Sequence, residues 1–271
     1  MKPSQRNKFI LGLGHQKCGT SWLHSYLNQS EHFANGFAKE FHVWDSLDIP
    51  LVKIVRPKFS LSTFLNQKKR MRYKMVNHPN YYFDYFNNLM KKNKFMTADI
   101  SPSYCGLKAE RLQFIKREFL ERGIDVKVVI LVREPLSRIK SAVRFNLDRK
   151  NYSEGIKPFE NNFISALEQY YKTEHCLLRT TYKNIIVETS KTFKSEDIHI
   201  GLYENMFEEN EVLRLSEFLQ IQPNFEIAKV HVNKTKGVVS DTPLDTEIKD
   251  YYTDTYEFMK SEFPIVTSLW T

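Results

Sequence analysis

Residues 12–23 read GLGHQKCGTSWL and join an apolar, strand-like run to a helical pattern that begins near Thr20. A strand, a glycine-containing turn and a helix in this order place several backbone N–H groups at a helix N-terminus, where the helix dipole favours an anion. Gly19 lets the backbone approach such an anion closely, and the hydroxyls of Thr20 and Ser21 add donors. The stretch therefore predicts a phosphate-binding or sulfate-binding loop; a capped strand-to-helix turn is the alternative.

The position of Lys17 separates two kinds of phosphate loop. In the GK[ST] loops of nucleotide kinases the lysine follows the last glycine and reaches the β- and γ-phosphates, and the next Ser or Thr holds Mg²⁺. Here Lys17 precedes Gly19, which places it to meet a bridging oxygen of a shorter anhydride. A transferring sulfuryl group carries about one negative charge where a phosphoryl group carries about two, so one lysine can neutralise the leaving oxygen without a metal. The loop is typical of a sulfate donor site.

Composition limits the class of protein. With 271 residues, 41% of them hydrophobic, one domain over residues 1–271 is the default. Forty Lys and Arg against 32 Asp and Glu give a formal charge of +8, which suits an anionic partner such as a nucleotide, a sulfated substrate, nucleic acid or a membrane surface. No apolar run reaches the ~18 residues needed to span a bilayer, and no signal peptide is evident. The three cysteines lack metal-ligand spacing, so we expect a cytoplasmic protein without a metal site.

Short apolar segments alternate with helical patterns along the chain. We expect buried strands at Phe9 to Leu13 and Val126 to Val132, and weaker ones at Phe95 to Ile100 and Ile198 to Leu202. Helical patterns lie at Ser21 to Asn28, Ala109 to Glu121, Asn161 to Tyr171 and Glu211 to Leu219. This order predicts an α/β fold, a three-layer, P-loop-like domain with a central, mainly parallel sheet flanked by helices. Residues 46–94 are expected to form helices and loops outside the sheet.

The residues HQKCGTSWL, 15–23, resemble the 5′-phosphosulfate loop of the sulfotransferases that use PAPS, 3′-phosphoadenosine 5′-phosphosulfate. The heparan sulfate type, with its QKxGTTxL pattern, is the most similar in motif. The resemblance implies PAPS as the donor and no metal. The donor contacts that it implies in this loop are Lys17, Cys18, Gly19, Thr20, Ser21 and Trp22.

A second stretch, VILVREPLSRIKSAVR at residues 129–144, resembles the family's 3′-phosphate motif. Arg133 leaves the end of an apolar strand, and Pro135 can occupy the first turn of the next helix, where its missing N–H is harmless. Ser141 lies about two helical turns beyond Arg133, so both side chains can face one phosphate. Such a strand-to-helix junction alone is more often structural, but beside the first loop it favours a 3′-phosphate site at Arg133 and Ser141.

Further segments downstream extend the resemblance. NKTKG, residues 233–237, resembles the late loop that closes over the nucleotide phosphates in the heparan sulfate enzymes. The donor contacts implied there are Lys234, Thr235, Lys236 and Gly237. Residues 99–106 and 202–221 also resemble family segments, so that the similarity runs through most of the chain.

The stretch AKEFHVWD, residues 38–45, resembles the KE-x-H-[FY]-[FW] segment that carries the family's catalytic glutamate. Glu40 is therefore the first choice of general base, and His42 the second, because an extended chain would point both to one side. His15 is a third choice, better suited to shaping the turn, and Lys39 can bind the donor or an anionic acceptor. The implied catalytic residues are Lys17, Glu40 and His42.

These motifs predict an enzyme that transfers a sulfuryl group from PAPS to a hydroxyl or amine of a small-molecule or saccharide acceptor. A saccharide, a lipid and a small alcohol all stay open as the acceptor, with a saccharide preferred. A nucleotide kinase or hydrolase is the first alternative, but the GK[ST] loop is missing. The second is a basic nucleic-acid-binding protein, which would use the Lys- and Arg-rich residues 66–74 and the aromatic residues 81–86. Aromatic residues in a helical pattern are more often core, so we expect no nucleic-acid partner.

Overall fold

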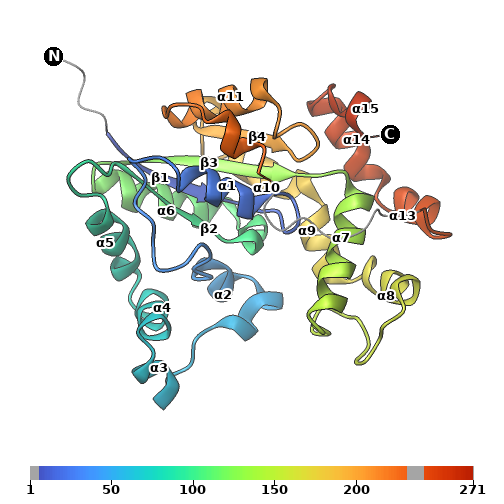
Figure 1. Ribbon diagram of the computed structural model, residues 1–271. Coiled ribbons are helices and arrows are strands. Elements are labelled where there is room, and N and C mark those ends of the chain that lie inside the picture. Colours follow the sequence, from blue (N-terminus) through green and yellow to red (C-terminus); the bar gives the residue numbers. More distant parts are fainter. Residues whose placement is uncertain (1–5, 231–240, 271) are drawn as a thin grey trace.

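A computed structural model describes residues 6–230 and 241–270. Within these ranges, a four-stranded sheet lies at the centre with helices on both sides (Figure 1). Its strands are β1 (Asn7–Gly12), β2 (Met96–Ile100), β3 (Ile124–Val132) and β4 (Ile198–Leu202). All neighbours pair in parallel, in the order β2-β1-β3-β4. The segments that follow the strands therefore meet at one edge of the sheet.

The apolar strands require cover on both faces, because parallel strands carry hydrophobic side chains on each side. In β1, Phe9 and Leu11 pack into one core and Ile10 into the other. The helices that cover the first face are α5 (Pro79–Leu89) and α6 (Ala109–Glu121), and those that cover the second are α1 (Thr20–Leu27) and α11 (Glu209–Leu219). The predicted three-layer α/β fold is confirmed.

The predicted elements are found, with small shifts at their ends. The strand at Ile198–Leu202 and the helix at Ala109–Glu121 have the predicted bounds, and the helix expected at Asn161 to Tyr171 is α8 (Phe163–Tyr170). Pro135 opens α7 (Pro135–Asp148), as expected. The helices without a sequence prediction are α9 (Glu174–Thr180), α10 (Tyr182–Ser190), α12 (Phe225–Ala228), α13 (Asp245–Tyr251), α14 (Thr253–Glu262) and α15 (Val266–Leu269). Two short 3-10 turns, η2 (Pro102–Gly106) and η3 (Ser195–Asp197), flank strands.

The segment between α1 and β2 leaves the sheet, as predicted. It forms α2 (Trp44–Asp48), the 3-10 turn η1 (Pro50–Val55), α3 (Leu61–Leu65), α4 (Gln67–Asn77) and α5. In Figure 1, α4 and α3 extend away from the sheet below α5. Tyr82, Phe83 and Phe86 are buried, so these aromatic rings belong to the core and are not available to stack on nucleic-acid bases. No helix in the described ranges is long and apolar enough to cross a bilayer.

Candidate active site

The chain turns sharply between β1 and α1. Gly14 and Gly19 have φ angles of 97° and 95°, in the region that favours glycine. A Cβ atom would lie 2.7 Å from the Pro102 carbonyl oxygen at the first position and 2.7 Å from Met206 Sδ at the second. Helix α1 begins at Thr20, as predicted, and the N–H groups of its first turn have no partners within the helix.

Three side chains of this loop point into the protein. Burial raises the pKa of the Cys18 thiol to about 12, and the Trp22 indole N–H donates to the carbonyl oxygen of Ala228 at 2.9 Å. His15 Nδ1 lies 3.1 Å from the carbonyl oxygen of Leu131, and burial lowers its pKa to about 3, so this histidine is neutral and shapes the turn. The side chains of Cys18 and Trp22 are therefore core groups, so the donor contacts predicted at these two positions would have to come from the backbone.

Three cationic side chains, in the loop and close to it, each lie next to an aromatic ring. Lys17 Nζ lies 4.6 Å from the centre of the Phe145 ring, and the Arg149 guanidinium lies 4.2 Å from the same centre. Arg133 lies 4.3 Å from the Tyr203 ring centre and donates to the carbonyl oxygen of Lys17 at 3.4 Å. None of the three cations forms an ion pair with a carboxylate in the described part of the chain. Burial, followed by the charges of Arg133 and Arg149, lowers the pKa of Lys17.

The other predicted donor contacts are placed only in part. Ser141 lies on α7 and is buried, and it makes no hydrogen bond to Arg133 among the described residues. Thr20 is buried and Ser21 is half-buried at the start of α1. The late loop residues Lys234, Thr235, Lys236 and Gly237 lie outside the described residues.

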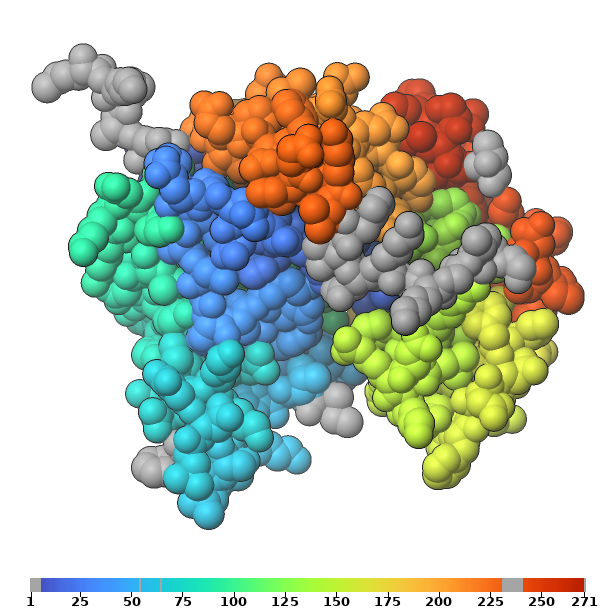
Figure 2. All heavy atoms as spheres, in the orientation of Figure 1, coloured from blue at the N-terminus to red at the C-terminus, as the bar shows by residue number. Residues whose placement is uncertain are grey.

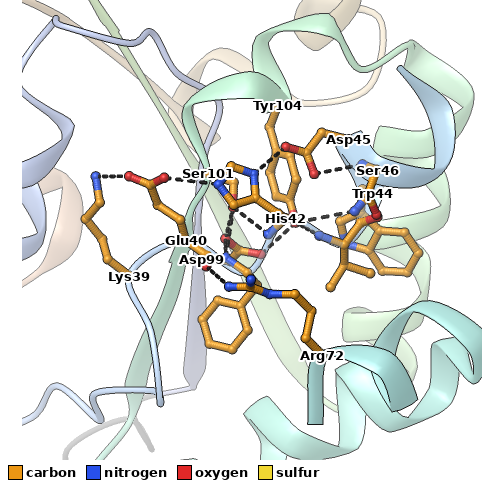
Figure 3. Close-up of polar contacts among 12 residues, drawn as sticks. Lys39, Glu40, His42, Trp44, Asp45, Ser46, Arg72, Asp99, Ser101 and Tyr104 are labelled. Carbon is orange, nitrogen blue, oxygen red and sulfur yellow. Dashed lines mark hydrogen bonds and ion pairs between the residues drawn. The ribbon is translucent and has the colours of Figure 1, made fainter. Parts of the chain in front are cut away.

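Four charged side chains before and within α2 form a row (Figure 3). Lys39 Nζ lies 2.6 Å from Glu40 Oε1, and Glu40 Oε2 lies 3.1 Å from His42 Nε2. On its other side, His42 Nδ1 lies 2.7 Å from Oδ2 of Asp45, a fully buried side chain. The imidazole is thus held between two carboxylates, and the structure brings the two candidate bases, Glu40 and His42, into contact.

This row sets the charges of both candidate bases. Burial acts to raise the pKa of Glu40, but its hydrogen bond to His42 and the charge and hydrogen bond of Lys39 lower it to about 2. Burial acts to lower the pKa of His42, but its hydrogen bonds to Asp45 and Glu40 raise it to about 9. At neutral pH Glu40 is therefore a carboxylate and His42 an imidazolium. Only Glu40 has a lone pair with which to accept a proton.

A buried carboxylate beneath this row fixes the backbone. Asp99, in β2, accepts hydrogen bonds from Tyr82 at 3.0 Å, Tyr104 at 2.7 Å and Ser101 at 2.7 Å. Burial raises its pKa to about 6, although these hydrogen bonds act to lower it. Ser101 Oγ in turn accepts from the backbone N–H of His42 at 3.1 Å, where φ is 53°. The segment with the candidate bases is thereby held at the carboxyl end of β2.

Lys39 connects the two halves of the site. Its Nζ contacts Glu40 and also donates to Thr20 Oγ1 at 3.2 Å, with a longer contact of 3.5 Å to Ser21 Oγ. Arg72, from α4, supports the same segment by donating to the backbone carbonyl oxygen of Glu40 at 2.9 Å. The candidate base therefore lies one lysine side chain away from the loop that is predicted to bind an anion.

Comparison with known proteins identifies the fold and its chemistry. Residues 7–259 match the model of the sulfotransferase domain. The chain belongs to the sulfotransferase domain family. A sulfotransferase from Alicyclobacillus acidocaldarius is similar in structure, with a TM-score of 0.60, 17% identity and coverage of 95% of each chain. Mouse sulfotransferase SULT7A1, complexed with PAP, gives a TM-score of 0.53 at 14% identity and covers 98% of this chain and 89% of its own. No curated protein sequence matches this one.

Family membership makes this protein an enzyme of sulfuryl transfer. It does not favour the nucleotide kinase or the nucleic-acid-binding alternative. Several residues of this sulfotransferase site have only weak sequence signals. Asp45 stands three residues after His42, a spacing that brings two side chains together once a helix begins between them. Arg149 and Arg72 meet the site from α7 and α4, and no local pattern indicates either contact.

Proposed function

We propose that this sulfotransferase transfers the sulfuryl group of PAPS to a hydroxyl or amine of an acceptor, in line and without a metal, and that residues 1–271 form one domain. The observation that carries the proposal is the group of three cations, Lys17, Arg133 and Arg149, which have aromatic partners and, within residues 6–230 and 241–270, no carboxylate partner. Such a group is suited to an incoming polyanion. The PAP bound to the mouse relative supports a nucleotide of the same kind here.

Donor binding divides between two places. We assign the 5′-phosphosulfate to Lys17 and to the N–H groups and hydroxyls of Gly19, Thr20 and Ser21, because the start of a helix and a nearby lysine both favour an anion. We assign the 3′-phosphate to Arg133 with Ser141, and we expect residues 234–237 to complete the donor site. Burial, followed by the neighbouring cations, lowers the pKa of Lys17, and a bound anion would favour its charged form.

The proposed transfer uses one base and one cation. Glu40 accepts the proton of the acceptor as the acceptor oxygen or nitrogen forms its bond to sulfur. The bond between sulfur and the bridging oxygen breaks, the electron pair stays on the 5′-phosphate of PAP, and Lys17 neutralises that oxygen. His42 is the positioning residue for Glu40 because it is already protonated at neutral pH. Lys39 is placed to contact the sulfuryl oxygens between the donor loop and the base.

For the acceptor we propose a saccharide. The support is the similarity of the HQKCGTSWL and KEFH stretches to the corresponding segments of the heparan sulfate enzymes. The balanced charges of the Lys39–Asp45 row also suit a neutral hydroxyl or amine better than an anionic nucleophile.

Label transfer tests the proposal directly. The protein would be incubated in EDTA with PAPS labelled in the sulfuryl group and with three acceptors: an oligosaccharide, a fatty alcohol and a small phenol. We expect label on the oligosaccharide, at a rate that EDTA does not change, and a rate roughly 10³-fold lower when Lys17→Ala replaces the wild type. Transfer that requires Mg²⁺ would contradict the metal-free mechanism. Transfer only to the alcohol or the phenol would contradict the saccharide assignment alone.

A further inference from the structure

The positive charge of the protein is concentrated in one segment. Residues 49–83 hold eight Lys and Arg and no Asp or Glu, which equals the formal charge of +8 for all 271 residues. The rest of the chain, with 32 Lys and Arg and 32 Asp and Glu, is balanced. The basic residues fall at positions 53–74, which we call the basic arm. A strong local charge of this kind indicates an anionic partner at this part of the surface.

The basic arm is also the most apolar exposed part of the surface. Twelve large hydrophobic side chains are exposed in the described part of the chain. Four of them lie inside the arm, between residues 55 and 65. Phe59, Leu61 and Leu65 are 77%, 74% and 72% exposed, and Val55 is the fourth. Soluble surfaces rarely gather large apolar groups in this way unless the groups meet a partner.

The exposed apolar side chains and the basic side chains of the arm lie on the same projection of the molecule. The Phe59 ring lies 5.9 Å from the Tyr73 ring of α4, so the turn before α3 packs back on the basic helix. Figure 1 shows α3 at the far end of the projection, and Figure 2 shows the same segment standing out from the body of the molecule. Lys68, Lys69 and Lys74 are exposed on α4.

We propose that the basic arm docks this protein on an anionic lipid membrane surface. Lysines beside an anionic bilayer are attracted to its headgroups, and apolar side chains such as Phe and Leu enter the boundary between headgroups and acyl chains. The apolar side chains favour a membrane over a sulfated polysaccharide or nucleic acid, because a soluble polyanion offers no apolar phase. Arg72 joins α4 to the backbone of Glu40, so docking places the catalytic segment near the membrane surface.

Vesicle flotation with the whole protein tests the proposal. The protein would be mixed with vesicles of phosphatidylcholine alone, with vesicles that contain about 30 mol% of the anionic lipid phosphatidylserine, and with soluble dextran sulfate. We expect binding to the anionic vesicles, little binding to phosphatidylcholine, and a decrease as salt rises. No binding to anionic vesicles would overturn the proposal.

Two pairs of substitutions separate the contribution of the basic side chains to vesicle binding from that of the apolar side chains. Lys68→Glu with Lys69→Glu should weaken binding to anionic vesicles roughly 30-fold or more. Phe59→Ser with Leu61→Ser should weaken vesicle binding roughly tenfold and leave dextran sulfate binding unchanged. The matched controls are Lys194→Glu with Lys229→Glu and the single change Phe159→Ser, all at exposed positions outside the arm. These controls should bind vesicles like the wild type.

The results can also contradict the proposal by their pattern. If dextran sulfate binds as tightly as the vesicles and the Phe59 and Leu61 substitutions change neither, the arm binds polyanions and the membrane assignment is wrong. If the controls lose as much vesicle binding as the arm variants, the attraction is not located in the arm. Unfolding midpoints measured for every variant identify any loss that comes from unfolding, and exposed positions should leave them unchanged.

Discussion

The two halves of the candidate active site carry charge in opposite ways. Behind the donor loop, Lys17, Arg133 and Arg149 have aromatic partners and no carboxylate partner in the described structure. In the row of charged side chains from Lys39 to Asp45, both positive groups, the Lys39 ammonium and the His42 imidazolium, contact a carboxylate. The first arrangement leaves positive charge for a ligand to neutralise, whereas the second is nearly neutral before any ligand binds.

This difference also appears in the ionisation of the side chains. The pKa of Lys17 is lowered by burial and by neighbouring cations, whereas that of His42 is raised by its two carboxylate partners. A bound anion would favour the charged form of Lys17, whereas it would disturb the balance of charges around His42. We infer that the donor half recognises charge and that the catalytic half handles a proton. Each prediction below removes one element of this contrast.

The largest effect is expected when the donor half loses Lys17. Lys17→Ala should lower turnover with PAPS roughly 10³-fold, because the oxygen that leaves sulfur then develops its charge without a cation. Binding of PAP should weaken far less, since Arg133 and the start of α1 remain. Single-turnover kinetics and calorimetry with PAP measure the two quantities, and Lys229→Ala, on the surface, is the control. A variant with unchanged turnover would show that Lys17 has no part in the transfer.

In the catalytic half, Glu40→Gln should lower turnover roughly 10²-fold. The amide keeps the shape of the side chain but cannot accept the proton. PAP affinity should not change, which distinguishes this residue from Lys17. His42→Gln should reduce turnover less than Glu40→Gln does. A larger loss from the histidine substitution would make His42 the base, contrary to its protonated state at neutral pH.

Asp45→Asn should move the pH dependence of turnover. The wild-type rate should be level from about pH 7 to 8, above the pKa of about 6 of the supporting carboxylate Asp99 and below the pKa of about 9 of His42. Without the Asp45 charge the pKa of His42 falls, so its deprotonation and the change in rate that follows it shift to lower pH. The log of kcat against pH for the two proteins measures the shift. Identical profiles would exclude His42 from the row that controls Glu40.

Stability should depend on the same histidine. A pKa raised from 6.5 to about 9 in the folded state stabilises the protein fully below pH 6.5, and the contribution is lost as pH rises through 9. The loss should be on the order of 3 kcal/mol in the free energy of unfolding, by the linkage between pKa and stability. Urea unfolding at pH 6 and pH 9.5 measures it. His42→Gln removes this part of the slope, and an unchanged slope in that variant would place the titration elsewhere.

The smallest effect is expected for Arg72→Ala. It removes one hydrogen bond, to the Glu40 backbone, worth about 1 kcal/mol, so turnover should fall only about fivefold. The neighbouring change Lys74→Ala, on the same helix, should leave turnover unchanged. Equal losses from both substitutions would indicate a general effect of α4 on the fold.

Much of the fold follows from local patterns. Strands apolar on both faces and a glycine turn at the start of a helix predict a parallel α/β sheet with an anion-binding edge, and the Glu40 and His42 stretch was predicted as well. The remainder depends on contacts between distant segments. Asp99 meets Tyr82 and Tyr104 only after β2, α5 and η2 have packed together. The inward direction of Cys18 and Trp22 depends likewise on the core that surrounds α1.

The central claim is that the donor half binds a nucleotide with two separate phosphate groups without a metal, and thermal unfolding with ligands tests it most directly. The protein would be melted with PAP in EDTA, with ATP and Mg²⁺, and with a single-stranded oligonucleotide. A ligand at about 100 times its dissociation constant adds ~2.7 kcal/mol, which raises the midpoint of a domain of this size by several degrees. We predict that PAP in EDTA raises the midpoint and that the other two ligands do not. Stabilisation by ATP with Mg²⁺ and none by PAP would contradict the claim.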